Sequence, residues 1–215
     1  MSKKKAVIID LDIGNIFSLR SALNFCGIDT KITSDISDLE TAENIILPGD
    51  GSFHYSMKKL QSKQLISFLK GLPKTNKNFL GICVGMQLLF ETSSEHKETG
   101  GLSILKGQVR PIPSTNNFNK KIEIPNMGWC PLYFKNNKGI NNSIIDGVDE
   151  LSKVYFIHSY RVENYDTNDE IASTNYFNHN ILAMVKKNNI TACQFHPEKS
   201  GEVGLKLLKN FFSLN

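Results

Sequence analysis

A cysteine placed between two glycines is the strongest chemical signal in this sequence. Residues 81–85 read Gly-Ile-Cys-Val-Gly, after a short apolar run and before a helical pattern at 86–90. A G-x-C-x-G turn between a strand and a helix is typical of a nucleophile elbow, in which the glycines relieve crowding and the central side chain stands above the sheet. The start of a helix also favours the thiolate. Cys83 is therefore a candidate nucleophile, and the alternative is a buried cysteine in a tight turn.

A histidine and a glutamate near the C-terminus could complete this chemistry. A nucleophilic cysteine needs a base, and the base needs an orienting partner. His196 and Glu198 flank a proline at the end of a predicted strand, and residues two apart in an extended chain point to the same side. Glu198 can therefore hold the His196 imidazole as the acid member of a triad. The histidines interpreted as structural are His54, His96 and His179.

The elements that position these residues alternate between strand and helix over the first ninety residues. The predicted strands are 6–9, 28–33, 45–47 and 79–82. Helical patterns at 16–26, closed by Gly27, and at 60–69 lie between them. Strands that alternate with helices predict a mainly parallel sheet. Active sites in such sheets open at the carboxyl ends of the strands, where the candidate nucleophile lies.

The rest of the chain is rich in short strands and poor in helices. The predicted strands are 104–112, 121–124, 132–134, 154–157, 171–176, 181–185 and 190–195, and a last helix is predicted near 203–212. Such runs favour antiparallel pairing, beside or extending the first sheet. No internal repeat or linker is visible. We therefore predict one α/β domain over residues 1–215, with a mainly parallel sheet and added antiparallel strands.

Composition excludes several classes of protein. The chain has 215 residues, of which 40% are hydrophobic, and a net charge of +4 that is too small for a nucleic-acid surface. No apolar run approaches the roughly 20 residues of a membrane-spanning helix. The 4 cysteines form no C-x-x-C pair, so no zinc knuckle or disulfide scaffold is indicated. Asp10 and Asp12 end the first apolar run too early for a signal peptide, so we expect a cytoplasmic protein without metal or cofactor.

With these motifs in place, the sequence resembles the class I (triad-type) glutamine amidotransferases over nearly its whole length. The stretches that carry the resemblance are 14–15, 47–53, 81–89, 124–129, 155–160, 194–201 and 204–211. Two of them, Ile124-Pro-Asn-Met-Gly-Trp129 and Tyr155-Phe-Ile-His-Ser-Tyr160, are typical of the glutaminase subunits of imidazole glycerol phosphate synthase. The resemblance implies a three-layer, flavodoxin-like fold. It also implies hydrolysis of L-glutamine to glutamate and ammonia, which passes to a partner synthase in histidine biosynthesis.

The resemblance also implies a role for each matching residue. Cys83 would be the nucleophile, His196 the general acid and base, and Glu198 its orienter. The oxyanion hole would use the Val84 N–H and an N–H of the loop from Gly49 to Gly51. The residues implied to hold glutamine are Gln87, Glu95, Ser159 and Tyr160, and those implied to meet the partner are Asn15, Asn126, Met127 and Trp129.

Three residues depart from the family pattern. Asp50 stands in the oxyanion loop where a small apolar residue is expected, and Asn126 and Cys130 stand where histidine and asparagine are usual. The last two lie on the face expected to meet the partner. That partner would be the synthase (cyclase) subunit of imidazole glycerol phosphate synthase or a homologous ammonia-using barrel. An alternative acceptor is a sugar nucleotide amidinated in surface-polysaccharide synthesis.

The chain shows no acceptor-binding motif of its own. An ammonia source without an acceptor would waste glutamine, so we expect low activity alone and activation by the partner. The glycine-rich stretch 48–51 could act as the switch, because one oxyanion donor is worth roughly 2.7–4 kcal/mol of barrier. No nucleic-acid or membrane partner is expected.

Two further hypotheses belong to other classes. Asp10 and Asp12 after an apolar strand resemble the D-x-D of haloacid-dehalogenase phosphatases, in which Asp10 would be the nucleophile and Mg²⁺ would be required. The sequence that follows does not continue that pattern. A non-enzymatic domain that kept the fold and lost catalysis is the other hypothesis, and the presence of Cys83, His196 and Glu198 argues against it.

Overall fold

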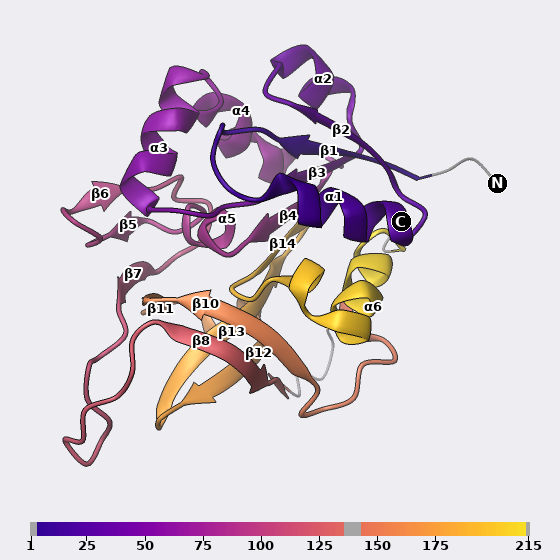
Figure 1. The fold of residues 1–215 in the computed structure, drawn as a ribbon. Helices are drawn as coiled ribbons and strands as arrows, with labels where there is room; N and C mark the ends of the chain where they lie inside the picture. The colour runs from indigo at the N-terminus through magenta and orange to yellow at the C-terminus, as the bar shows by residue number, and fades with distance from the viewer. Residues whose placement is uncertain (1–3, 136–142, 214–215) are drawn as a thin grey trace.

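An eight-stranded sheet forms the centre of the computed structural model, which describes residues 4–135 and 143–213. Its order is β2-β1-β3-β4-β14-β13-β12-β9 (Figure 1). The bounds are β1 Lys5–Ile9, β2 Asp29–Thr33, β3 Asn44–Leu47, β4 Asn78–Ile82, β9 Tyr133–Phe134, β12 Glu170–Tyr176, β13 His179–Lys187 and β14 Ile190–Cys193. Strands β2 to β14 in that order are parallel, and β13, β12 and β9 pair antiparallel. The predicted mainly parallel sheet with added antiparallel strands is confirmed.

Two smaller sheets and the helices surround this sheet. Strand β8 (Asn126–Pro131) pairs with β10 (Lys153–His158), and the order β11-β7-β5-β6 forms the other sheet. Its strands are β5 Thr92–Ser93, β6 Thr99–Gly100, β7 Gln108–Pro111 and β11 Tyr160–Glu163. The helices are α1 Ile16–Phe25, α2 Ile36–Thr41, α3 Phe53–Ser62, α4 Ile66–Gly71, α5 Val84–Gln87 and α6 Gly201–Phe211, with 3₁₀ turns η1 Leu72–Lys74, η2 Ser143–Ile145, η3 Thr167–Asp169 and η4 Pro197–Lys199. Helices α1 and α6 lie next to each other, apart from α3 and α4 (Figure 1).

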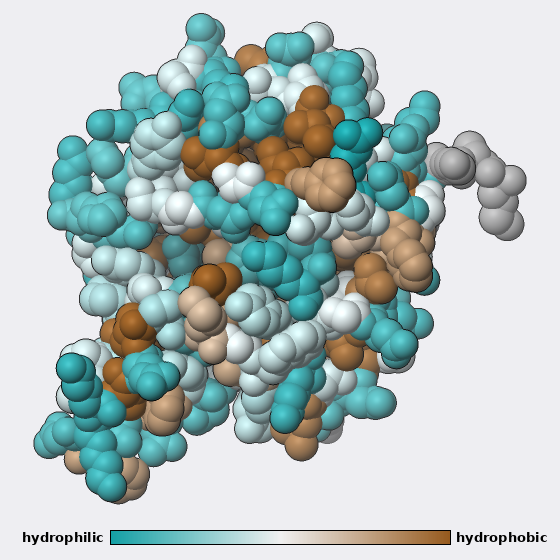
Figure 2. All heavy atoms as spheres, in the orientation of Figure 1, coloured by the Kyte–Doolittle hydropathy of each residue, from teal (hydrophilic) through white to brown (hydrophobic). Residues whose placement is uncertain are grey.

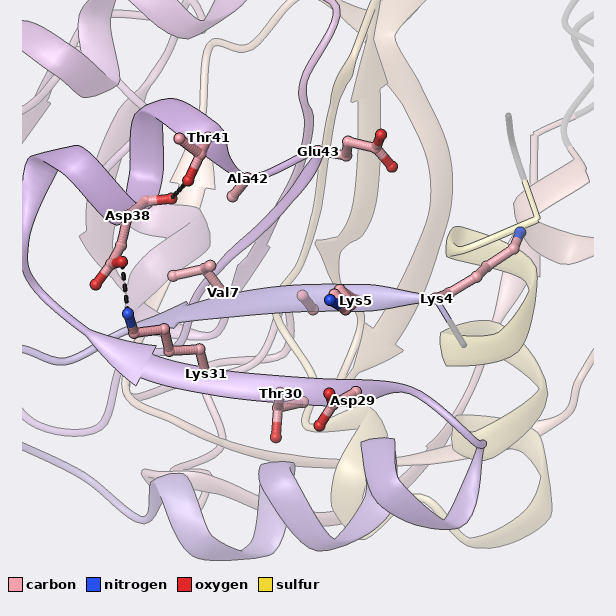
Figure 3. Close-up of a pocket in the computed structure, with 11 residues that line it drawn as sticks. Lys4, Lys5, Val7, Asp29, Thr30, Lys31, Asp38, Thr41, Ala42 and Glu43 are labelled. Carbon is pink, nitrogen blue, oxygen red and sulfur yellow. Dashed lines mark hydrogen bonds and ion pairs between the residues drawn. The ribbon is translucent and has the colours of Figure 1, made fainter. Parts of the chain in front are cut away.

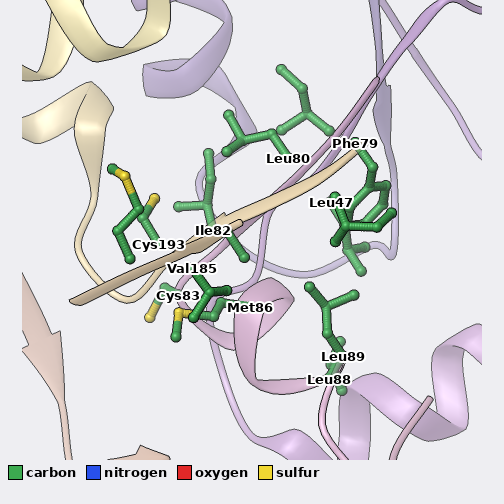
Figure 4. Close-up of a cluster of buried hydrophobic side chains, with 14 of the residues drawn as sticks. Leu47, Phe79, Leu80, Ile82, Cys83, Met86, Leu88, Leu89, Val185 and Cys193 are labelled. Carbon is green, nitrogen blue, oxygen red and sulfur yellow. The ribbon is translucent and has the colours of Figure 1, made fainter. Parts of the chain in front are cut away.

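The core lies around the central parallel strands. Every residue of β3, β4 and β14 is buried, as expected for strands covered on both faces. Leu47, Phe79 and Ile82 pack there with Val185 from the antiparallel part (Figure 4). The nucleophile turn follows β4 directly, so the packed core holds its backbone in place.

The edge strand β2 is more exposed, and a hollow lies beside it. The hollow is lined from β1, β2 and α2, and the ion pair between Lys31 Nζ and Asp38 Oδ1 (2.5 Å) spans part of it (Figure 3). Its lining mixes acidic and basic groups. None of the residues singled out from the sequence lines it.

Several predicted boundaries are wrong, for local reasons. The stretch 60–69 belongs to two helices, because Gln64 between them takes a positive φ of 59°. The strand 104–112 shrinks to β7, because Gly107 just before it has φ 132°. No strand forms at 121–124, where only a single bridge joins Thr115 and Lys121. Helix α2 and strands β5, β6, β8 and β11 were not expected; β5 and β6 have two residues each, and β8 and β11 are half-exposed, which weakens their hydrophobic alternation.

The surface is mixed in character. Hydrophobic side chains interrupt a mostly hydrophilic face in Figure 2. Over residues 4–135 and 143–213, no helix combines the length and apolar character that crossing a membrane requires.

Candidate active site

Cys83 occupies a strained turn at the carboxyl end of β4. Its φ of 53° and ψ of −112° lie in a region that residues with a side chain rarely adopt. A Cβ on Gly81 would come within 2.8 Å of the Gly85 carbonyl oxygen, and one on Gly85 would overlap the Leu47 carbonyl oxygen. Both glycines are therefore required sterically, as expected for a nucleophile elbow.

The helix after this turn is shorter than the sequence predicts. Helix α5 covers only Val84–Gln87, whereas a helical pattern was expected at 86–90. The N–H groups of Met86 and Gln87 donate to the Cys83 carbonyl oxygen at 3.0 and 3.1 Å. One turn of helix has too small a dipole to account for a stabilised thiolate, so that part of the expectation is not supported.

Parallel pairing of β14 with β4 brings the C-terminal motif to Cys83. Cys193 pairs with Ile82, and the Cys83 N–H donates to the Cys193 carbonyl oxygen at 2.8 Å. His196 follows, and its N–H donates to the Tyr155 carbonyl oxygen at 2.9 Å. The His196 carbonyl oxygen accepts from Ser200 Oγ at 2.6 Å. The backbone of His196 is therefore fixed on both sides.

His196 and Glu198 form a close buried pair. His196 Nδ1 lies 2.7 Å from Glu198 Oε1, and both side chains are almost wholly buried. Burial alone would lower the pKa of His196, but Cys83 and Glu198 together raise it to about 10. His196 Nε2 has no partner at ordinary hydrogen-bond distance among the described residues. Because no hydrogen bond to Nε2 is formed, the effect of Cys83 on the pKa of His196 is electrostatic.

Gln194 was not assigned a role from the sequence, yet it contacts the nucleophile. Its side-chain Nε2 donates to the Cys83 sulfur at 3.7 Å, and its Oε1 accepts from Gln87 Nε2 at 2.9 Å. The residue is fully buried. Its position two residues before His196 could have indicated this, since alternate residues of an extended chain share a side.

One pocket collects most of the residues predicted to act on substrate. Its lining is Asp50, Gly51, Cys83, Val84, Gln87, Glu95, Pro125, Ile157, His158, Ser159, Tyr160, His196 and Lys199. Gln87 Nε2 donates to Gln194 and to the Tyr160 carbonyl oxygen at 3.3 Å, so its amide hydrogens are used within the protein. Glu95 Oε2 accepts from the Phe53 N–H at 2.6 Å, at the start of α3. Both side chains are thus fixed by the protein at the pocket.

The predicted oxyanion donor is occupied by the protein itself. The Val84 N–H donates to the Gly49 carbonyl oxygen at 3.3 Å. Two oxygens cannot share this donor at full strength, so in this conformation the loop competes with an oxyanion. A Cβ on Gly49 would lie 2.5 Å from the Gly85 N, whereas Gly51, with φ 109°, has open space around it.

Asn126 lies inside the protein, which corrects its expected place on the partner face. It is 1% exposed, and its Nδ2 lies 3.0 Å from His158 Nε2. Cys130, the other departure on this strand, has its sulfur 3.5 Å from Asn126 Oδ1. His158 Nδ1 in turn lies 2.8 Å from the Tyr160 carbonyl oxygen. The two departures thus form one inward-facing network that leads to the pocket.

The direction of the hydrogen bonds in this network follows from His158. Burial lowers its pKa to about 4, although the Tyr160 carbonyl favours the charged form. The imidazole is therefore neutral, with Nδ1–H donating to Tyr160 and Nε2 accepting from the Asn126 amide. Asn126 Oδ1 is then left to accept from the Cys130 thiol.

The other residues expected to meet a partner do reach the surface. Met127 and Trp129 on β8 are 59% and 53% exposed. Trp129 packs edge-on against Tyr155, with ring centroids 6.1 Å apart. Asn15 is exposed as well, and its Oδ1 caps α1 by accepting from the Ser18 N–H at 3.2 Å.

The comparisons with known proteins agree with this site. Residues 7–214 match the family "Glutamine amidotransferase class-I". The chain is 43% identical to the "Imidazole glycerol phosphate synthase subunit HisH" of Caldanaerobacter subterraneus subsp. tengcongensis, over 95% of each chain. It is 39% identical to the subunit of that name from Aquifex aeolicus, over 96% of this chain and 95% of that one. The chain therefore belongs to the class I glutamine amidotransferase family, within the group formed by the imidazole glycerol phosphate synthase subunits HisH.

Solved structures support the fold. A putative GMP synthase protein from Thermoplasma acidophilum superposes with a TM-score of 0.70 at 22% identity, covering 99% of this chain and 94% of that one. PurLQS from Thermotoga maritima gives 0.68 at 20% identity, with 99% of each chain covered. These structures place the chain on the fold of the class I amidotransferases.

The family overturns the phosphatase hypothesis and the non-enzymatic one. Of the two aspartates in the phosphatase hypothesis, Asp12 forms ion pairs with Lys59 (3.2 Å) and Lys63 (3.1 Å). Lys63 and Lys59 lower the pKa of Asp12 through hydrogen bonds. Within the part of the chain that the structure describes, no group of three His, Cys, Asp or Glu side chains could hold a metal ion.

Proposed function

We propose that this protein is the glutaminase subunit of an imidazole glycerol phosphate synthase. It hydrolyses L-glutamine to glutamate and ammonia and delivers the ammonia to a synthase subunit in histidine biosynthesis. The observation that carries the proposal is the pocket that Cys83 and His196 line together, with His196 held from behind by the buried Glu198. The extensive identity to HisH subunits supports the pathway.

Covalent catalysis follows from this geometry. The Cys83 thiolate attacks the side-chain amide carbon of glutamine, and the C=O electron pair moves onto oxygen. The imidazolium of His196 donates its proton to the departing nitrogen, the C–N bond breaks, and ammonia leaves a thioester on Cys83. Neutral His196 then takes a proton from water, whose oxygen attacks the thioester. Glutamate is released, and the thiolate and the imidazolium are restored.

The oxyanion formed in both steps needs donors. The Val84 N–H is one candidate, and an N–H of the loop that holds Gly49 and Gly51 is the second. Because the Gly49 carbonyl now accepts from Val84, this loop must rotate before the hole is complete. Loss of one such donor costs about 10²–10³ in kcat. We therefore expect slow hydrolysis by the isolated chain and faster hydrolysis with the partner bound.

We propose that the partner is the synthase (cyclase) subunit. It docks on the surface that Met127, Trp129 and Asn15 form. Large exposed side chains such as Trp129 are common anchors of interfaces. The buried side chain of Asn126 is not among the contacts. The alternative acceptor, a sugar nucleotide, was considered because Asn126 and Cys130 depart from the family pattern on the expected docking face. Both side chains make contacts inside the protein, so they do not alter that face and give the alternative no support.

The test of the proposed function measures both binding of the cyclase subunit and formation of its product. The chain is used to capture a purified cyclase subunit, and the complex is assayed with glutamine and the ribonucleotide precursor of imidazole glycerol phosphate. Product is expected with glutamine for the native chain. A captured cyclase that makes product from ammonium salts, but never from glutamine, would reject the proposal.

A further inference from the structure

A buried histidine lines the pocket but takes no part in the chemistry described above. His158 is 6% exposed, ends β10 and lies at the pocket with Cys83 and His196. Its Nδ1 lies 2.8 Å from the Tyr160 carbonyl oxygen, and its Nε2 lies 3.0 Å from Asn126 Nδ2. The protein itself thus engages both ring nitrogens. His158 is therefore not placed to exchange a proton with substrate.

The protons of this network have one consistent arrangement. Asn126 Nδ2 only donates, so His158 Nε2 accepts from it and the single proton of the neutral ring lies on Nδ1. The Tyr160 carbonyl only accepts, which matches that arrangement. The Cys130 thiol donates to Asn126 Oδ1 at 3.5 Å and keeps the amide the same way round. The three side chains therefore donate in one direction, toward the Tyr160 carbonyl.

The Tyr160 carbonyl oxygen accepts a second hydrogen bond from the pocket. Gln87 Nε2 donates to it at 3.3 Å, and the same nitrogen donates to Gln194 Oε1 at 2.9 Å. A carbonyl oxygen has two lone pairs, so His158 and Gln87 fill it. The bond from His158 is the shorter of the two. Loss of the imidazole would leave this carbonyl with the weaker donor alone.

His158 also bridges two strands at the pocket. Strand β10 ends at His158 and β11 begins at Tyr160, with the bend at Ser159 between them. The Ser159 carbonyl oxygen accepts from the Ile112 N–H at 2.9 Å, which fixes one side of the bend to the neighbouring chain. The His158 side chain fixes the other side, because it reaches over the bend to the Tyr160 carbonyl. The shape of the bend therefore depends on this ring.

We propose that His158 is a positioning residue for glutamine binding, whose Nδ1–H holds the Tyr160 carbonyl while Asn126 holds the ring through Nε2. This inference rests on the proposed glutaminase function, because Ser159 and Tyr160 are expected to hold glutamine through their backbone. Contacts made by this bend are present in the bound substrate and in the transition state alike. Loss of His158 therefore weakens both equally, which raises KM and leaves kcat nearly unchanged.

The experiment compares His158→Leu, His158→Asn and the native chain in steady-state glutamine hydrolysis, each in complex with a cyclase subunit. Leucine removes the donor, and KM should rise at least about tenfold, the usual effect of a lost hydrogen bond to a buried carbonyl. Asparagine places an amide N–H near the position of Nδ1–H, so KM should rise by at most about threefold. In both variants kcat should stay within about threefold of the native value.

Asn126→Leu tests the support of the ring. It removes the donor to Nε2 and should raise KM in the same direction as His158→Leu, by a smaller factor. In the His158→Leu background it should add nothing, because the ring that it supports is gone. His179→Leu is the matched control: His179 Nε2 lies 2.8 Å from the Thr115 carbonyl oxygen, away from the pocket. Its KM and kcat should equal the native values.

The variants separate positioning from packing. A folded His158→Leu chain with native KM overturns the proposal, and so does a His158→Asn chain whose KM is as high as that of His158→Leu. Where circular dichroism shows that His158→Leu does not fold, Asn126→Leu decides, and its native KM would overturn the proposal. A native complex that does not hydrolyse glutamine would instead reject the proposed function on which this role depends.

Discussion

Gln194 donates its side-chain amide to the Cys83 sulfur, at an Nε2–Sγ distance of 3.7 Å. This contact holds the sulfur in place at the carboxyl end of β4. The Gln87 side chain holds Gln194 from the other side, which orients its amide. The nucleophile is thus supported by a residue that contributes no chemistry of its own.

Replacing Gln194 with leucine should therefore slow alkylation of Cys83 by iodoacetamide by roughly fivefold, because the sulfur loses a hydrogen bond worth about 1 kcal/mol that orients it. Leucine fills a similar volume but donates no hydrogen bond. Gln108→Leu, at a half-buried glutamine in the smaller sheet, is the control and should react at the native rate. Equal rates for the Gln194 variant and the native chain would show that the contact does not orient the nucleophile.

Cys83→Ala should abolish glutamine hydrolysis, because among the residues described at the pocket Cys83 supplies the only thiol. A complex containing this variant should still make product from ammonium salts, since the synthase subunit is unaltered. Cys26→Ala, at a half-buried thiol bonded to the Leu205 carbonyl, should keep full activity. Undiminished hydrolysis by Cys83→Ala would remove the triad assignment.

Glu198→Gln should lower kcat by at least about 10²-fold, because an amide orients the imidazole but no longer stabilises its charged form. The pKa of His196 should fall as well, since Glu198 is one of the groups that raise it. Steady-state kinetics and a histidine NMR titration measure the two effects. Glu202→Gln, at an exposed carboxylate in the first turn of α6, should change neither.

Burial of His158 predicts acid sensitivity of the fold. Its pKa is about 4 in the native state and near 6.5 when unfolded, so the unfolded state binds the proton first as pH falls. Stability from this group is complete above pH 6.5 and is lost as pH falls toward 4. Urea unfolding should show a loss of about 2 kcal/mol between pH 7 and pH 5 that is absent from His158→Gln. The same pH dependence in both proteins would contradict this assignment.

Gly85→Ala should be strongly destabilising, by about 3 kcal/mol or more, because its Cβ would overlap the Leu47 carbonyl oxygen in a packed core. Gly100→Ala is the matched control, since nothing lies within 4 Å of a Cβ there. Thermal unfolding compares the two variants. A Gly85→Ala midpoint close to that of Gly100→Ala would show that the turn relaxes easily.

Local patterns in the sequence accounted for the central strands and for the nucleophile turn. Continuous apolar runs identify β1, β3 and β4, because strands covered on both faces need hydrophobic residues throughout. The glycines around Cys83 indicate a turn that only they can form. The pairing of His196 with Glu198 followed from their spacing of two.

Other features depended on contacts between distant residues. Strand β14 was expected among antiparallel neighbours, yet it pairs parallel with β4 on one side and antiparallel with β13 on the other. A strand's own residues do not determine its neighbour's direction. The inward turn of Asn126 was missed because β8 was not expected: in a strand, Asn126 lies on the opposite face from Met127 and Trp129, which reach the surface. The contact between Asp50 and His196 joins residues far apart in the chain and had no local signal.

The parallel pairing of β4 with β14 has a consequence for the protein during its synthesis. The strand that precedes Cys83 emerges from the ribosome about a hundred residues before its neighbour near residue 190. A nascent or truncated polypeptide therefore holds the thiol without the imidazole and cannot consume glutamine.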